Sequence, residues 1–175
     1  VIPSHVAPVI PAFEEAGCDI SISQGSITLT APPCLKSIKT IRTMPYPGFP
    51  TDMQAQIMAM TTLCHGTSVI IETIFESRYK HVSELLRFGA KIRVDGRMAV
   101  IEGVGSLTAA KVISSDLRGG ASLVLAGLAA QGTTTVENIK YILRGYENMS
   151  GVLTSLGCDI VKEERNTADG GKENS

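Results

Sequence analysis

Two aspartates and three arginines are the residues of this sequence best suited to do chemistry. Asp52 and Asp116 each stand at the expected start of a helix, and a carboxylate so placed can act as a general base. Arginine offers a planar group that clamps a carboxylate or a phosphate through two hydrogen bonds. The arginines that follow the aspartates are Arg78, Arg118 and Arg144. If these side chains converge, they form a site for an anionic substrate with a base beside it.

The approach to Asp52 is unusually stiff. Residues 43–56 read TMPYPGFPTDMQAQ and place three prolines and a glycine within six positions. Thr51 and Gln54 then match a T-x-x-Q capping box, with Asp52 at the first helical position, where an acid complements the helix dipole. That structural role alone would account for Asp52. The rigid entry, and the recurrence of an aspartate at a helix start at Asp116, favour a pre-organised site instead.

Two neighbouring features leave alternatives open. Arg144, in the segment LRGY, is expected near a helix start, where its charge is slightly unfavourable and calls for a partner. Gly119 and Gly120 follow Arg118 inside an expected helix, at a cost of roughly 1 kcal/mol each relative to Ala. They serve either close packing or the approach of a ligand to the backbone.

The elements that would carry these residues follow from an internal repeat of about 70 residues. Gly17, Gly89 and Gly157 lie 72 and 68 residues apart, and each stands between an amphipathic segment and an alternating strand. Such glycines are typical left-handed caps of helix ends. Two-residue hairpin turns follow the first two of them, at Gln24-Gly25 and at Asp95-Gly96.

The rest of the repeat also recurs. The helices that begin at the two aspartates end at Gly66 and Gly132, and β-branched strands then run to Glu72 and Glu137. The unit is therefore strand, helix, strand, helix and two strands. Residues 121–130 are apolar nearly all round, which predicts a buried helix. The other helix is expected to have one apolar face, made by Met53, Ile57, Met60 and Leu63.

This repeat divides the chain into a half unit at residues 1–50, two units at 51–115 and 116–164, and a tail at 165–175. The tail has no apolar residue larger than Ala168 and is expected to be disordered. The chain begins at Val1 rather than Met, which we interpret as a processed product or an excised piece. Pro8 and Pro11 interrupt the first helix, which should be kinked or start late.

Composition narrows the class of protein. The net charge of −1 and the scattered bases argue against nucleic-acid binding, and no apolar run suits a membrane span or a signal peptide. The cysteines have no metal-like spacing and favour a reduced, cytoplasmic protein in which none is a nucleophile: Cys18, Cys34, Cys64 and Cys158. His81 is expected near solvent at a helix start. We expect neither a metal nor a cofactor.

Four segments together resemble one family closely: PYPGFPTDMQAQ, ETIFESRY, DLRGGASLVLAG and LRGYE. It is the bacterial UDP-N-acetylglucosamine enolpyruvyl transferase (MurA) family, which performs the first committed step of peptidoglycan synthesis. The resemblance covers nearly all of residues 1–164 but only the C-terminal portion of the family's longer members. It implies an α/β fold, an inside-out barrel of pseudo-threefold βαβαββ repeats with central helices, here as an incomplete ring.

The resemblance also implies a reaction. The enolpyruvyl group of phosphoenolpyruvate would pass to the 3-hydroxyl of UDP-N-acetylglucosamine, with release of phosphate. Asp52 matches the general base, Asp116 a residue implicated in proton transfer at the pyruvyl carbon, and Ile74 a position whose backbone contacts the UDP-sugar. Arg118 and Arg144 match residues that hold phosphoenolpyruvate and phosphate.

The same resemblance places Arg78 at a site arginine that supports the closed form. It assigns the family's cysteine acid and Lys-Asn pair to an N-terminal domain that this chain does not include. The chain alone should therefore be inactive, bind UDP-N-acetylglucosamine weakly at best, and associate with itself through its unfilled half unit.

Two alternatives remain. A non-catalytic α/β repeat module would use the same core for binding or assembly. An enolpyruvylshikimate-phosphate synthase would share the fold but is not expected to carry the proline-framed aspartate.

Overall fold

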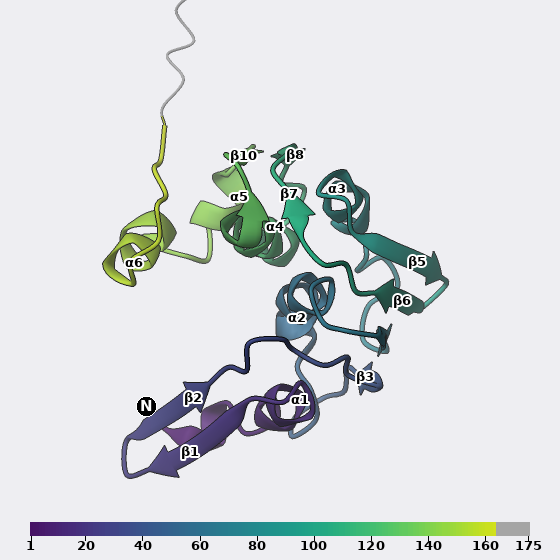
Figure 1. Cartoon of the computed structure of the whole chain (residues 1–175), viewed down its shortest axis with the longest axis vertical. Coiled ribbons are helices and arrows are strands. Elements are labelled where there is room, and N and C mark those ends of the chain that lie inside the picture. Colours follow the sequence, from purple (N-terminus) through teal and green to yellow (C-terminus); the bar gives the residue numbers. More distant parts are fainter. Residues whose placement is uncertain (164–175) are drawn as a thin grey trace, which may run out of the picture.

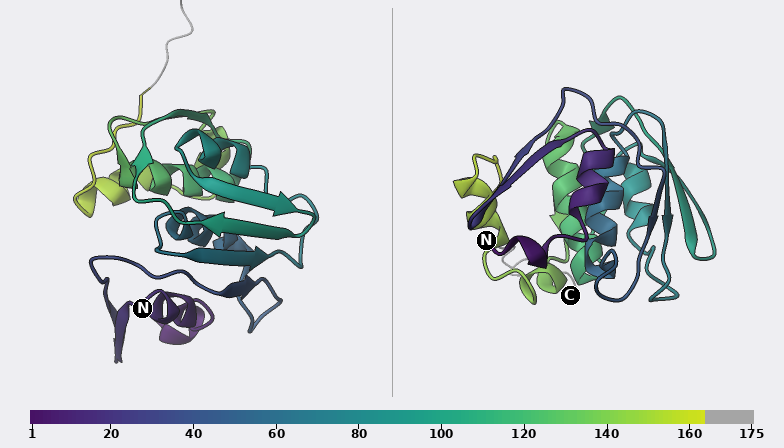
Figure 2. Two further views of the ribbon diagram at one scale, coloured as in Figure 1. Left: turned by 45° about the vertical axis from the view of Figure 1, so that its right-hand side comes forward. Right: turned by 90° about the horizontal axis from the view of Figure 1, so that it is seen from below.

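Helices lie in the middle of the molecule and strands lie around them. The computed structural model describes residues 1–163 (Figure 1). The central helices α2 (Gln54–Thr61) and α4 (Leu117–Ala129) pack against each other, and Figure 2 shows α1 (Ile10–Glu15) beside them with strands outside. The predicted α/β class and its inside-out arrangement are confirmed. The predicted tail lies outside the described residues.

One repeat is complete. Strands β3 (Thr40–Arg42) and β4 (Thr67–Ile71) pair in parallel and are joined through α2. Helix α3 (Val82–Arg87) then leads into a hairpin of β5 (Lys91–Asp95) and β6 (Met98–Glu102). The sheet order is β3-β4-β6-β5. This is the predicted succession of strand, helix, strand, helix and two strands.

The next repeat has the same first half. Strands β8 (Lys111–Ile113) and β10 (Thr135–Glu137) pair in parallel across α4, while β7 (Leu107–Thr108) pairs with β9 (Ala130–Gln131). Helices α5 (Lys140–Leu143) and α6 (Met149–Ser155) follow. The strand predicted after Gly157 is absent from residues 158–163, so that prediction was wrong. A strand needs a partner for its backbone groups, and the described chain supplies none there.

The half unit precedes both repeats. It consists of the 3₁₀ turn η1 (Pro3–His5), α1, and an antiparallel hairpin of β1 (Asp19–Ser23) and β2 (Ser26–Thr30). Helix α1 starts only at Ile10 and carries Pro11 in its first turn, which confirms the predicted late start.

The glycines that punctuate the repeats have the predicted conformation. Gly17, Gly89 and Gly157 follow α1, α3 and α6 with φ of 93°, 86° and 92°, in the left-handed region. The second hairpin turn lies one residue later than predicted. Asp95 pairs with Met98, so the turn residues are Gly96 and Arg97.

Of the two central helices, α4 matches the prediction and α2 does not. Helix α4 is buried over Gly119–Val124 and at Ala126, as predicted. Helix α2 does not present a single apolar face, because α4 and strands β4 and β6 all pack against it. Most of its residues are therefore buried: Gln54, Ala55, Ile57, Met58, Ala59 and Thr61. No helix within residues 1–163 combines the length and apolar character needed to cross a bilayer.

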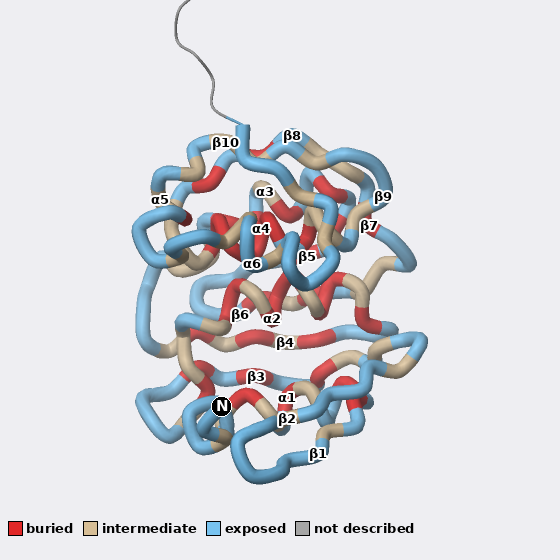
Figure 3. Tube along the Cα trace, turned by 90° about the vertical axis from the view of Figure 1, so that its left-hand side faces the viewer, coloured by how far each residue is buried: buried red, intermediate tan, exposed pale blue. Residues whose placement is uncertain are grey.

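The hairpin of the half unit is the least covered part of the described chain. Figure 3 shows β1 and β2 mostly in the exposed colour, whereas buried and intermediate residues alternate along most of β4. Ile22 and Leu29 are 53% and 43% exposed. Apolar side chains thus face solvent on this hairpin, although α1 contacts β1.

Gly103 offers a direct test of how closely the sheet approaches the end of α2. Its N–H donates to the Gly66 carbonyl at 2.9 Å, and a Cβ there would lie 1.6 Å from the Cys64 carbonyl oxygen. Backbone cannot rotate away, so Gly103→Ala should lower the free energy of unfolding by about 3 kcal/mol. Gly105→Ala is the matched control, since nothing lies within 4 Å of its Cβ position. Urea unfolding of both variants checks this, and equal stabilities would contradict the close approach.

Candidate functional site

The carboxylate of Asp52 lies between two arginines from different repeats. Arg78 Nη2 is 3.1 Å from Oδ1, and Arg118 Nη2 is 2.7 Å from Oδ2. The Asp52 side chain is 55% exposed, whereas those of Arg78 and Arg118 are 21% and 27% exposed. The arginines are thus held by the fold while the carboxylate faces outward. The predicted convergence of Asp52, Arg78 and Arg118 is observed.

Aromatic side chains support both arginines. The Arg118 guanidinium lies 5.8 Å from the centre of the Tyr146 ring and donates to its hydroxyl at 3.3 Å. The hydrogen bond to Asp52 raises the pKa of Arg118 further, against the opposing effect of partial burial, and Tyr146 adds to the rise. Arg78 lies 5.2 Å from the centre of the Phe75 ring. Two permanent positive charges are therefore fixed side by side at an open surface.

Asp52 does not occupy the helix position that the sequence predicted. Residues Thr51–Met53 form a 3₁₀ turn, η2, and α2 begins only at Gln54. The capping box was wrong: the Thr51 hydroxyl makes no cap and donates instead to Glu72 Oε2 at 2.9 Å. A buried carboxylate is the better acceptor. Two ion pairs, rather than a helix dipole, neutralise the charge of Asp52.

Asp116 holds its predicted place but not the same geometry. It caps α4 by accepting a hydrogen bond from the Gly119 N–H at 2.8 Å. Within residues 1–163 no hydrogen bond or ion pair joins Asp116 to Asp52, and His81 lies near both Asp116 and Arg78. The structure thus places Asp116 next to the arginine cluster, through a histidine, rather than in it.

His81 is buried, which corrects the prediction of a solvent-near residue. It is 1% exposed at the start of α3, and its Nε2 atom has no hydrogen-bond partner among residues 1–163. Burial lowers the pKa of His81 to about 4, with Asp116 opposing this and Arg78 adding to it. The ring is therefore neutral at neutral pH. Packing of α3 against α4 beside Gly119 excludes water there.

The two remaining predicted residues stand apart from the ion pairs. Arg144 directly follows α5 and is exposed, and it makes no ion pair within residues 1–163. It caps a helix end rather than lying near a helix start, so its charge is favourable there. The N–H of Ile74 donates to Glu72 Oε1 at 2.8 Å. Ile74 lies at the surface, with 37% exposure.

Sequence reasoning missed two residues that organise the site. Glu72 was noted only as a strand end, and Tyr146 only as part of the segment LRGY. Tyr146 also accepts a hydrogen bond from Gln56 Nε2 at 3.3 Å, which ties α2 to the residues after α5. Both depend on partners far away in the chain, and no spacing rule reveals them. The one available signal was a charged residue at the end of a buried β-branched strand.

The double glycine after Arg118 serves close packing. A Cβ at Gly119 would lie 2.9 Å from the Cβ of His81, and one at Gly120 would lie 2.3 Å from the Ser114 hydroxyl oxygen. Both neighbours belong to the protein itself. Close packing, one of the two predicted roles, therefore explains both glycines. The other role, approach of a ligand to the backbone, is not needed to explain them.

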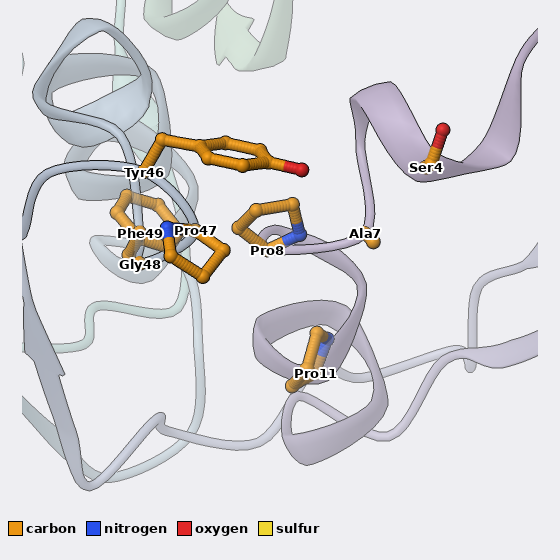
Figure 4. Close-up of a pocket in the computed structure, with 8 residues that line it drawn as sticks. All are labelled: Ser4, Ala7, Pro8, Pro11, Tyr46, Pro47, Gly48 and Phe49. Atoms are coloured by element: carbon orange, nitrogen blue, oxygen red, sulfur yellow. The ribbon is translucent and has the colours of Figure 1, made fainter.

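A pocket of about 380 Å³ lies elsewhere, between the N-terminal segment and the proline loop (Figure 4). Pro8 and Pro11 face Tyr46 and Pro47 across it. The residues that line it include no Asp, Glu, Lys, Arg or His. It has no charged side chain to hold a phosphate and no carboxylate or imidazole to accept a proton, so the candidate site is the Asp52 cluster: Asp52, Arg78, Arg118 and Tyr146.

The cysteines take no part in this cluster. All four are free, and burial raises the pKa of the Cys64 thiol to about 11. That thiol stays protonated at neutral pH, which makes it a poor nucleophile. Within residues 1–163 no three His, Cys, Asp or Glu side chains are grouped so as to hold a metal ion.

Comparison with known proteins supplies the family. The profile described as EPSP synthase (3-phosphoshikimate 1-carboxyvinyltransferase) matches residues 4–153. The chain belongs to the EPSP synthase family. The enolpyruvyl transferase NikO from Streptomyces tendae superposes with a TM-score of 0.79 at 25% identity, over 88% of this chain and 36% of that chain. EPSP synthase from Acinetobacter baumannii shares the fold, with a TM-score of 0.69 at 16% identity over 89% and 40% of the two chains.

The relatives within this family are more specific. UDP-N-acetylglucosamine 1-carboxyvinyltransferase 2 of Caldanaerobacter subterraneus subsp. tengcongensis is 48% identical over 158 residues, which is 90% of this chain and 38% of that protein. The UDP-N-acetylglucosamine 1-carboxyvinyltransferase of Desulfofundulus thermocisternus is 50% identical over 91% of this chain and 65% of its own length. The predicted resemblance to the UDP-N-acetylglucosamine branch is confirmed. The chain spans 38% of the first of these relatives.

Proposed function

We propose that the protein containing this chain transfers the enolpyruvyl group of phosphoenolpyruvate to the 3-hydroxyl of UDP-N-acetylglucosamine. The reaction releases phosphate and serves peptidoglycan synthesis in the cytoplasm. The observation that carries this proposal is the exposed Asp52 carboxylate between the Arg78 and Arg118 guanidinium groups. Relatives that are about half identical over nine tenths of the chain, and that carry the name of this activity, support it.

The cluster suits the charge changes of this reaction. Asp52 takes the proton of the sugar hydroxyl, and the hydroxyl oxygen then forms a bond to C2 of phosphoenolpyruvate as its C3 gains a proton. That proton then leaves C3 again as the C2–O bond to phosphate breaks. The enolpyruvyl ether of the sugar and free phosphate are the products. Arg118 and Arg144 hold the phosphoenolpyruvate and the phosphate, and Asp116 serves proton transfer at the pyruvyl carbon. Fixed positive charges stabilise such states because they need no reorganisation.

The ion pairs of Asp52 give its arginines a resting partner. In the described structure the carboxylate occupies the same guanidinium donors that an incoming phosphate or carboxylate would use. An anionic substrate therefore competes with Asp52 for Arg78 and Arg118. When it displaces Asp52, the carboxylate is released toward the open surface where the sugar hydroxyl would lie. Binding of one substrate thus frees the base for the other.

A chimera tests the proposal. This chain replaces the matching 158-residue segment of the Caldanaerobacter relative, and phosphate release is followed with phosphoenolpyruvate and either UDP-N-acetylglucosamine or shikimate 3-phosphate. We expect release with the nucleotide sugar alone, and no turnover by the 175-residue chain on its own. Release with shikimate 3-phosphate would move the protein to the other branch. No release in a folded chimera would favour a non-catalytic module.

The uncovered hairpin makes self-association the expected behaviour of the chain on its own. The remaining portion of the family's fold is the partner proposed to cover the half unit, and without it Ile22 and Leu29 stay exposed. Sedimentation velocity should show a dimer that weakens when Ile22→Ser and Leu29→Ser are combined. Gln24 and Gly25 form the exposed turn of the same hairpin, and nothing lies within 4 Å of the Cβ position of Gly25. Gln24→Ser is therefore the control. A monomer at all concentrations would contradict this expectation.

A further inference from the structure

Glu72 is a buried carboxylate that is satisfied without any cation. It lies directly after β4, is 1% exposed, and makes none of the ion pairs found within residues 1–163. Its oxygens accept hydrogen bonds from two threonine hydroxyls and two backbone N–H groups. The donors and distances are Thr43 Oγ1 at 2.9 Å, Thr51 Oγ1 at 2.9 Å, Ile74 N at 2.8 Å and Phe75 N at 3.1 Å.

These four donors belong to two separate loops. Thr43 and Thr51 stand at the two ends of the proline loop, and Ile74 and Phe75 open the loop that leads to Arg78. The loops are also joined directly, since the Thr73 N–H donates to the Thr43 hydroxyl at 2.9 Å and the Thr73 hydroxyl donates to the Thr43 carbonyl. Glu72 is therefore the common acceptor between them.

A clasp between the two loops is formed by Glu72 and its four donors, Thr43, Thr51, Ile74 and Phe75. This clasp reaches the candidate site through both loops. Thr51 directly precedes Asp52, and Arg78 is the residue whose Nη2 pairs with Asp52 Oδ1. A shift of either loop would change the distance between the carboxylate and its arginine. The stiff proline loop alone cannot set that distance, because the arginine stands on the other loop.

The free energy of burial alone does not explain a carboxylate here. Burial of a charge costs free energy that hydrogen bonds only partly return, and an apolar side chain of similar volume would often be as stable. An apolar side chain would, however, leave four donors unsatisfied, and only the hydrogen bonds between Thr43 and Thr73 would still join the two loops. The charge at this position is therefore explained by the geometry that it imposes.

We propose that Glu72 is a positioning residue, which sets the place of the base Asp52 through Thr51 and that of Arg78 through the amides of Ile74 and Phe75. The inference rests on the proposed function, because it assigns Asp52 the role of base. Glu72 itself touches no substrate. Misplacement of a reacting group by about 1 Å can cost about 100-fold in rate, so even a small slackening of this clasp should be measurable.

The sharpest variant removes one hydrogen bond of the clasp, from the Thr51 hydroxyl to Glu72, and leaves the other three. In the chimera, Thr51→Val should lower kcat about 10- to 100-fold with KM for UDP-N-acetylglucosamine changed less than about threefold, and Thr51→Ser should restore kcat. Thr61→Val is the control, since Thr61 is fully buried, whereas Thr51 is half-buried, and the Thr61 hydroxyl donates to the Met58 carbonyl within α2. A residue that serves stability alone would lower the melting temperature of both valine variants and leave kcat at 25 °C unchanged in both.

The charge itself is tested at Glu72. Glu72→Gln keeps one oxygen for Thr43, Ile74 and Phe75 and turns its amide toward the Thr51 oxygen, so it should retain kcat within about fivefold. Glu72→Ala should lower kcat at least as much as Thr51→Val. A second readout needs no turnover and uses the 175-residue chain. Glu72→Ala should speed hydrogen exchange at the Ile74 and Phe75 amides at least tenfold relative to the parent chain. The amide of Gly89, which lies outside the clasp, is the internal reference and should change less.

These outcomes separate the two proposals. The chimera could be inactive while the Ile74 and Phe75 amides exchange slowly in the parent chain and fast in Glu72→Ala. That result would refute the proposed function and support the clasp. An active chimera in which Thr51→Val has the kcat of the parent would overturn the positioning role. So would exchange at Ile74 and Phe75 that Glu72→Ala does not change.

Discussion

Asp52→Asn is expected to lower kcat of the chimera about 10²- to 10⁴-fold, the range by which a general base accelerates reactions. Asparagine keeps the shape of the side chain and one oxygen for the arginines but cannot accept the proton of the sugar hydroxyl. Phosphate release under saturating substrates measures the loss. KM for phosphoenolpyruvate should fall, because the neutral asparagine competes less well than the carboxylate for Arg78 and Arg118.

The fold should tolerate this change. Asp52 is 55% exposed, and ion pairs at that exposure contribute less than about 1 kcal/mol. Glu76→Gln is the matched control: Glu76 is a loop carboxylate 3.5 Å from Arg97 with 87% exposure, and its loss removes one charge near the cluster without touching it. Parental activity is expected in Glu76→Gln. Equal activity in Asp52→Asn would remove Asp52 from the role of base.

His81 should make the stability of the chain depend on pH. Its pKa falls to about 4 in the folded protein from an ordinary value of 6.5. Between these values the unfolded chain binds a proton that the folded chain does not, so stability is fully present above pH 6.5 and is lost as the pH falls toward 4. The lowered pKa corresponds to a loss of roughly 3 kcal/mol across that window.

Urea unfolding of the chain at pH 7 and at pH 4.5 checks this expectation. His81→Asn should lose roughly 2 kcal/mol less than the parent between the two values, since carboxylates contribute equally to both proteins. His65→Asn is the control, because it replaces an exposed histidine in place of the buried one. A parental pH dependence in His81→Asn would mean that the buried ring does not titrate as described.

Much of the fold was predictable because its signals are local. The glycines that end helices, the turn at Gln24-Gly25 and the apolar run of α4 each reflect a conformation set within a few residues. The strand expected after Gly157 failed for the opposite reason. Its alternating pattern is a necessary feature of a strand, but only a neighbouring strand can satisfy its backbone, and no pattern in the same segment reports whether a neighbour exists.

The site divides in the same way. The residue types and their repeat positions pointed to Asp52, Arg78 and Arg118, and the structure joins them. The burial of His81 follows from how α3 meets α4, and the acceptor role of Glu72 follows from threonines 29 and 21 residues away. Contacts of that range come from tertiary packing. They decide whether a polar residue is a surface group or an organiser of the site.

A crystal structure of the chimera with UDP-N-acetylglucosamine bound would test the central claim most directly. The account predicts a carboxylate oxygen of Asp52 about 2.6–3.2 Å from the sugar 3-hydroxyl, within reach of its proton. It would be contradicted by a bound sugar whose 3-hydroxyl meets another acceptor while Asp52 stays paired with Arg78 and Arg118.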